Sequence, residues 1–159
     1  MADVFTKAKR SEVMAQIRSR GNQDTELALA KLLRRHRVTG WRRHVQVRIA
    51  ERGMRNRESR TSHSALRVFT VRPDFVFRTL RTVVFVDGCF WHGCPKHATR
   101  PQSNRVFWRR KLSSNKARDA LVTRMLRKAG WRVLRVWEHE LARKNQERLL
   151  NRIHRIMIR

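Results

Sequence analysis

The chain has 159 residues, enough for one domain with a buried core and too few for a second independent domain. Its 39 Lys and Arg outnumber 12 Asp and Glu, and the net charge of +27 far exceeds what solubility requires, so a polyanionic partner is expected, nucleic acid first. Two cysteines, no apolar run of about 18 residues and no hydrophobic signal segment argue against disulfide-rich, membrane-spanning and secreted classes. We therefore expect a cytoplasmic protein with no membrane partner.

The N-terminal part of the chain predicts two helices, a strand and a loop. Ser11 is suited to cap a helix over residues 11–20, and leucines recur at helical spacing over residues 29–33. Apolar and polar residues alternate over residues 45–49, which is typical of a strand with one buried face. Residues 50–67 carry many charges and few apolar side chains, so we predict an exposed, basic loop there.

The remainder of the chain predicts strands enclosed by helices. Two apolar strands flank a short turn centred near residue 80, as in a central hairpin, and Gly130 is a plausible helix stop. Such an order implies an α/β or α+β domain with a mixed sheet. The predicted elements are strands at 74–77 and 82–87, a helix from Asn104 over 105–112, a second helix over about 115–128, a strand at 131–140 and an amphipathic helix over 143–159.

The segment DGCFWHGCPKH concentrates residue types that bind soft metals. In a reducing compartment, two cysteines this close favour a metal over a disulfide, and the following histidine completes a C-x₄-C-x₂-H cluster. Tetrahedral Zn²⁺ needs one more ligand, for which His139 is the first candidate and His92 the rival. The predicted ligands of a structural Zn²⁺ are Cys89, Cys94, His97 and His139.

The predicted hairpin brings a hard-oxygen site beside an imidazole. It sets Asp74 across from about Val86, next to the segment that runs into His92. A carboxylate with a neighbouring backbone carbonyl can hold Mg²⁺, and His92 is placed to activate a water of that ion. Glu26 and Asp119 can each accept a hydrogen bond from an imidazole N–H, which orients the ring and favours its protonated form.

Phe90 and Trp91 lie between these two sets of ligands and admit two interpretations. As core aromatics they simply bury area. As a wedge on a metal-held loop they unstack a duplex at a cost of a few kcal/mol, which is smaller where pairing is already defective. The second interpretation connects the loop to the recognition of mismatches.

Five segments of the chain resemble the very short patch repair endonucleases, a branch of the restriction-endonuclease-like nucleases. The resemblance spans roughly residues 8–142, leaving 50–67 as an inserted basic loop and 143–159 as a C-terminal helix of a single endonuclease domain, 1–159. It implies a restriction-endonuclease-like mixed central sheet flanked by helices, with a structural zinc site. The segments are RPDFVF, VVFVDGCFWHGCPKH, NRVFW, NKARD and GWRVLRVWEHEL.

The resemblance also implies an activity and its substrate. Enzymes of this family nick double-stranded DNA 5′ to the T of a T:G mismatch, left when 5-methylcytosine deaminates, in a reaction that requires Mg²⁺. For this chain it implies a monomer bound to double-stranded DNA at the bacterial nucleoid, with other mismatch-repair proteins as candidate partners.

Residue roles follow from motif position under this resemblance. Asp74 is implied as the metal-binding carboxylate, with the Val86 backbone carbonyl as a second Mg²⁺ contact. His92 is implied as the general base, supported by Glu26 and Asp119. The implied intercalating residues are Phe90, Trp91 and, from the opposite groove, Met14, and the implied zinc ligands are Cys89, Cys94, His97 and His139.

The same sequence features are compatible with two other functions. A zinc-stabilised DNA-binding module without cleavage activity explains the charge, the cysteines and the aromatics, but leaves Asp74 and His92 without a role. A nuclease of the same fold that cuts other structures or undamaged sites is the third possibility. The approach to Asp74 also departs from the family, because this chain has TVRPD after a basic insertion where the family commonly has LPGxPD.

Overall fold

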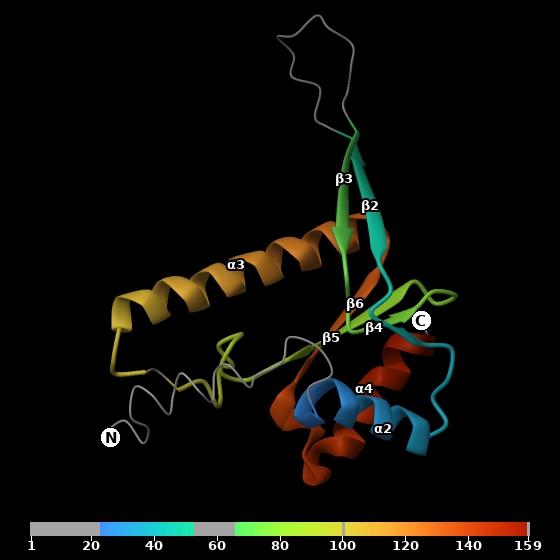
Figure 1. Cartoon of the computed structure of the whole chain (residues 1–159). Coiled ribbons are helices and arrows are strands. Elements are labelled where there is room, and N and C mark those ends of the chain that lie inside the picture. The colour runs from blue at the N-terminus through green and yellow to red at the C-terminus, as the bar shows by residue number, and fades with distance from the viewer. Residues whose placement is uncertain (1–22, 53–65, 100, 159) are drawn as a thin grey trace, which may run out of the picture.

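The structure is a computed structural model that describes residues 23–52, 66–99 and 101–158 (Figure 1). The predicted helix over 11–20, with Ser11 and Met14, lies outside these residues, as does most of the predicted loop at 50–67. Among the described helices, none is both long enough and apolar enough to cross a membrane.

A four-stranded mixed sheet forms the centre of the fold. Its order is β1-β4-β5-β6, with β1 and β4 and β4 and β5 antiparallel and β5 and β6 parallel. A parallel pair needs a crossover connection, which the long helix α3 provides between β5 and β6 (Figure 1). The strands are β1 (Arg42–Arg43), β4 (Phe75–Phe77), β5 (Thr82–Asp87) and β6 (Arg132–Trp137), and α3 spans Arg105–Lys128.

Helices α2 and α4 cover one face of this sheet (Figure 1). A turn of π-helix at Gln23–Leu27 leads into α2 (Ala28–Arg35), and α4 (Gln146–Ile158) closes the chain. Alternation along the strands sends one set of side chains to this face, because successive side chains of a strand point to opposite sides. The packed core here includes Leu29, Leu33, Phe75, Phe77, Val84, Val136, Leu149 and Ile153.

The opposite face is covered by the end of α3 and by a two-stranded ribbon. Strands β2 (Val47–Arg52) and β3 (Leu66–Val71) are antiparallel, with Val47 opposite Val71 and Arg52 opposite Leu66. The N-terminal half of α3 extends beyond the sheet, while its last turns lie over it (Figure 1). The core of this second face consists of Val47, Ile49, Val76, Val83, Met125, Leu126 and Val133.

Several predicted elements are confirmed. The central hairpin runs over Phe75–Phe77 and Thr82–Asp87, and β5 is rich in β-branched residues, as buried strands are. The C-terminal helix is present as Gln146–Ile158. Asn104, with φ 50, directly precedes α3 as predicted.

Other boundaries were wrong. The helices predicted at 105–112 and 115–128 are one continuous helix, because no Gly or Pro separates them and the two serines between them do not end a helix. The strand predicted at 131–140 ends at Trp137, and a 3₁₀ turn over Glu138–Leu141 follows. The start of β3 replaces the end of the predicted loop 50–67, and β1 was not predicted because two residues carry no periodicity.

Candidate active site and metal centre

Asp74 directly precedes β4 and faces the end of β5. The pairing of Phe75 with Val84 brings the Val86 backbone alongside, and the Val86 N–H donates to Asp74 Oδ2 at 2.7 Å. Burial raises the pKa of Asp74 to about 6, against the Val86 hydrogen bond, which lowers it. The predicted proximity of Asp74 and Val86 is confirmed. A buried carboxylate that resists ionisation is suited to a cation, since a positive charge restores the ionised form.

Glu26 reaches the same place from the turn before α2. It is buried, and its Oε2 lies 2.7 Å from Arg43 Nη2 and 3.0 Å from His44 Nε2. Glu26, His44 and Asp74 each offer a ligand atom within 4.8 Å of the others. The predicted pairing of Glu26 with His92 is therefore wrong: the imidazole at Glu26 is that of His44. Glu26 instead adds a second carboxylate beside Asp74.

His92 pairs with Asp119, as predicted. Its Nδ1 lies 2.6 Å from Asp119 Oδ2, an interaction that joins the loop after β5 to the middle of α3. A second carboxylate stands behind this pair, with Asp87 Oδ1 3.6 Å from the same ring nitrogen. Because Nδ1 faces acceptors, Nε2 is the nitrogen left to take a proton from a reacting group.

Arg135 holds the two carboxylates together. Its Nε and Nη2 donate to the two oxygens of Asp87 at 2.6 and 2.5 Å, and Nη2 lies 3.1 Å from Asp119 Oδ1. Asp87 is only 3 % exposed, so this bidentate cation offsets much of its desolvation cost. Neither Asp87 nor Arg135 was predicted as a site residue. The available signals were an acidic residue closing a buried strand and an arginine within the apolar strand RVLRVW.

Both groups open into one cavity of about 600 Å³. The residues that line it include Glu26, Asp74, His92 and Asp119, and Arg118 supplies a cation. We call it the active-site cavity. Carboxylates able to hold a cation and an imidazole able to take a proton thus share one solvent-accessible space, which is what hydrolysis of a phosphate ester requires.

A second cluster, here the four-ligand centre, gathers Cys89, Cys94, His97 and His139, whose ligand atoms all lie within 4.8 Å of one another. Cys89 Sγ lies 3.3 Å from His139 Nδ1, and Cys94 Sγ lies 3.8 Å from His97 Nδ1. Both thiols are buried and unpaired by disulfide, and burial raises the pKa of Cys89 to about 11. Two thiols and two imidazoles match structural zinc in kind and number.

Backbone bonds and turns assemble the four-ligand centre. The N–H of Cys89 donates to Glu138 Oε2 at 3.0 Å, and the N–H of Cys94 donates to the Cys89 carbonyl at 2.9 Å. The turn that ends β6 carries His139 to the cysteines. His92, the rival ligand, pairs with Asp119 instead.

Phe90 and Trp91 form a surface cluster with a third aromatic, Trp108 from α3. The ring centroids of Phe90 lie 5.2 Å from both tryptophans, and those of Trp91 and Trp108 are 5.9 Å apart. All three side chains are half-buried and belong to neither core of the sheet described above. Asn115 fixes the loop by donating to the Trp91 carbonyl at 2.9 Å. Trp108 was not predicted, although it ends the NRVFW motif and precedes three cations.

Comparison with known proteins connects this geometry to a family. The family model for DNA mismatch endonuclease Vsr matches residues 35–98, which include Asp74 and the cysteine segment. Type II nicking enzyme V.NaeI of Lentzea aerocolonigenes is 54% identical over 70 residues, which are 44% of this chain and 42% of that enzyme.

Two further relatives match along most of the chain. Type II nicking enzyme V.NmeAIP of Neisseria meningitidis serogroup A is 33% identical over 99% of this chain and 95% of its own length. DNA mismatch endonuclease Vsr of Escherichia coli strain K12 is 34% identical over 87% of this chain and 74% of its own. With relatives of this identity matched along most of their length, the chain belongs to the Vsr family of DNA endonucleases.

Proposed function

We propose that this protein nicks double-stranded DNA 5′ to the T of a T:G mismatch produced by deamination of 5-methylcytosine, and so starts very short patch repair. The observation that carries the proposal is the shared cavity, which is lined by Asp74 and by the His92–Asp119 pair. The loop that contains His92 also contains the aromatic residues Phe90 and Trp91. The relatives named as nicking enzymes and as a mismatch endonuclease support the reaction class.

Mg²⁺ is the proposed catalytic cofactor, and the residues present fit it. Asp74 and Glu26 supply hard carboxylate oxygens within 4.8 Å of each other, and the Val86 backbone lies alongside to offer its carbonyl. When bound, Mg²⁺ would neutralise charge that develops on the scissile phosphate. Burial raises the pKa of Asp74 to about 6, and a bound cation would oppose that shift by favouring the ionised carboxylate.

His92 is the proposed general base. With Nδ1 directed at Asp119, its Nε2 accepts the proton of the attacking water as that oxygen bonds to phosphorus and one P–O ester bond breaks. Asp119 then stabilises the imidazolium through the 2.6 Å contact. Arg135 keeps Asp87 and Asp119 in place, so we assign it a positioning role.

The four-ligand centre is the proposed site of a structural Zn²⁺, which would hold the loop from Cys89 to His97 in shape. That loop carries His92 and the aromatic pair. We propose that Phe90, Trp91 and Trp108 insert beside the mismatch, where unstacking costs least. Met14, outside the described residues, stays a predicted partner from the opposite groove.

A panel of labelled duplexes that differ only at the mismatch tests the function. With Mg²⁺, the protein should nick the T strand of T:G duplex and leave C:G and T:A duplexes intact. Equal nicking of all duplexes would favour a nuclease without mismatch selectivity. Binding without nicking in any metal would favour the DNA-binding module.

A further inference from the structure

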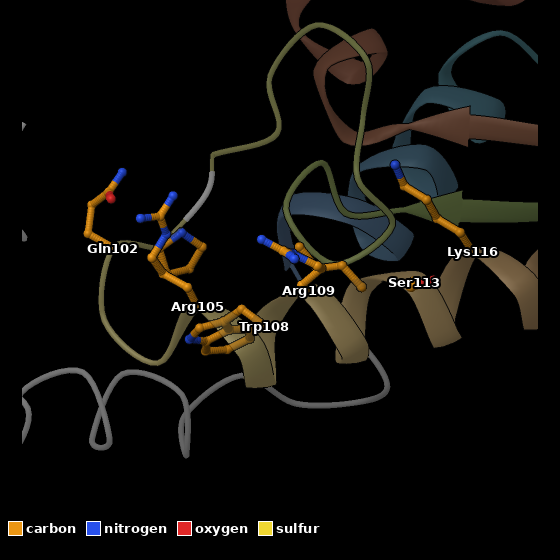
Figure 2. Close-up of a pocket in the computed structure, with 8 residues that line it drawn as sticks. Gln102, Arg105, Trp108, Arg109, Ser113 and Lys116 are labelled. Atoms are coloured by element: carbon orange, nitrogen blue, oxygen red, sulfur yellow. The ribbon is translucent and has the colours of Figure 1, made fainter.

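A second cavity, of about 470 Å³, lies against the first turns of α3 (Figure 2). It shares no lining residue with the active-site cavity. We call it the α3 pocket, and most of its lining residues belong to the part of α3 that extends beyond the sheet (Figure 1). The side chains that matter here are Arg105, Trp108, Arg109, Leu112, Ser113 and Lys116.

Three cations of the α3 pocket lie along one side of the helix. Arg105, Arg109 and Lys116 are separated by four and seven residues, which places them on a common face, and Figure 2 shows them following one another along α3. Like charges at this spacing repel, so their arrangement costs stability unless an anion lies between them.

That anion does not come from the part of the chain that the structure describes. No ion pair with a described carboxylate involves Arg105, Arg109 or Lys116. The sequence explains why: between Asp87 and Asp119 there are eight Lys and Arg and no acidic residue. Within the described residues, the positive charge of the α3 pocket therefore has no acidic partner.

The side chain of Lys116 lies close to the backbone of Gly93, in the loop between His92 and Cys94. Gly93 has φ +61, and a Cβ added there would lie 2.2 Å from Lys116 Cε and 2.7 Å from its Nζ. The positive φ favours glycine here, whereas the close approach involves only the flexible end of the lysine side chain. Lys116 is exposed, and the end of its side chain lies beside the loop between His92 and Cys94.

Trp108 links the α3 pocket to the aromatic cluster. It lines the pocket and also contacts Phe90, at 5.2 Å between ring centroids. Arg105 and Lys116 are eleven residues apart, about 16 Å along the helix axis. One DNA strand presents a phosphate for about every 3.4 Å of duplex axis, so this face spans several consecutive phosphates.

We propose that the α3 pocket binds the sugar–phosphate backbone of the duplex beside the intercalation point. This inference rests on the proposed function, because it extends the same DNA surface away from the scissile phosphate. Contacts to phosphates carry no sequence information, so the pocket supplies affinity and register for matched and mismatched DNA alike. Discrimination stays with the aromatic cluster.

The test removes two of these cations and keeps the helix. Arg105→Gln with Arg109→Gln changes exposed side chains, and the matched control, Arg148→Gln with Arg155→Gln, removes the same charge from exposed positions of α4. Fluorescence anisotropy with matched and T:G duplexes, between about 50 and 200 mM salt, gives the slope of log affinity against log salt. The α3 variant should lower the magnitude of that slope by about 1.8, and should weaken both duplexes by the same factor.

The alternatives give different results. A slope equal to that of the α4 control, or a loss confined to T:G duplex, would overturn the proposal. Inorganic phosphate that displaces DNA from wild type, but not from the α3 variant, at constant ionic strength would assign the pocket to a free anion instead. If wild type bound but never nicked T:G duplex, the proposed function would fail, whereas the salt slopes on matched duplex would still decide the pocket.

Discussion

The four-ligand centre and the active-site cavity are neighbours on one loop but are assembled in different ways. Three ligands of the centre fall within nine residues, from Cys89 to His97, and only His139 comes from elsewhere. The active-site cavity takes its groups from the turn before α2, from β4, from the loop after β5 and from α3. One is a local motif, and the other is a product of the whole fold.

The two sites also differ in what they cost the folded protein. In the four-ligand centre the thiols are neutral when protonated and the imidazoles are neutral when unprotonated, so the four side chains can come together without a charge. The active-site cavity instead gathers Asp74, Glu26, Asp87 and Asp119, and offsets them with arginines at Arg43 and Arg135. We infer that the first site adds stability when loaded, whereas the second spends stability on a charge arrangement that catalysis needs. Variants at the active-site cavity should therefore lose nicking activity, whereas variants at the four-ligand centre should lose bound metal and stability.

The largest effect is expected at the active-site cavity. His92→Ala removes the proposed proton acceptor and Asp74→Ala removes a proposed carboxylate ligand, and neither removes the basic surface or the four-ligand centre. Loss of a general base typically costs about 10²- to 10⁴-fold in rate. Single-turnover nicking of T:G duplex should fall by at least that range, while gel-shift affinity should stay close to wild type. Wild-type nicking by Asp74→Ala would show that the cation site lies elsewhere.

The four-ligand centre should give the opposite pattern. Cys94→Ala removes a buried ligand, and because structural zinc contributes directly to folding, the variant should lose bound zinc and several kcal/mol of stability. Metal analysis by mass spectrometry and thermal unfolding are the measurements. Ser114→Ala, an exposed position on α3, serves as the control. A wild-type protein that carries no zinc after purification without chelators would remove the proposed metal.

A third variant addresses the link between the two carboxylates behind His92. Arg135→Met leaves the nearly buried Asp87 without its bidentate partner, and breaking such a pair typically costs about 3 kcal/mol. Adding Asp87→Asn should recover much of that stability, because the uncompensated charge is gone. If Arg135 positions Asp119, the single variant should also nick more slowly at saturating DNA with unchanged affinity. Equal stability of the single and double variants would contradict the pairing.

The contrast between local and distributed sites also explains what the sequence could predict. The cysteine segment and the central hairpin depend on neighbouring residues, so spacing and alternation were enough to predict the cluster of Cys89, Cys94 and His97 and the approach of Asp74 to Val86. The partner of Glu26 was wrong because it depends on how the turn before α2 packs against β1, where His44 competes with His92. The spacing of residues in the sequence does not indicate which of the two histidines contacts Glu26.

The missed residues have the same cause. Arg135 sits at an intermediate position in a strand whose neighbours are buried, and only the parallel pairing of β5 with β6 brings it beside Asp87. Trp108 joins Phe90 and Trp91 only once α3 is one unbroken helix, which the predicted break near residues 113–114 obscured. Strand pairing and helix continuity had to be known before these contacts could be inferred.

The smallest expected effect concerns the pH dependence of stability at Asp74. Its carboxyl has an ordinary pKa of 3.8 in the unfolded chain and, because of burial, about 6 in the folded protein. Between these values the folded state keeps one more proton, so the free energy of unfolding falls as pH rises through this window and stays lower above it. A shift of about two units limits the loss to about 3 kcal/mol.

Asp74→Asn removes this titration while keeping a side chain of nearly the same shape. Without Mg²⁺ and without chelator, the variant should match wild type near pH 4 and exceed it in stability above pH 6, by at most about 3 kcal/mol in urea unfolding. Protonation of the cysteine and histidine ligands at low pH affects both proteins equally and cancels in the difference. Mg²⁺ should then stabilise wild type more than the variant, since a ligand that binds the folded state shifts unfolding by mass action. A difference between the two proteins that is constant from pH 4 to 8 would mean that Asp74 ionises normally, and the charge cost assigned to the active-site cavity would then lie with its other carboxylates.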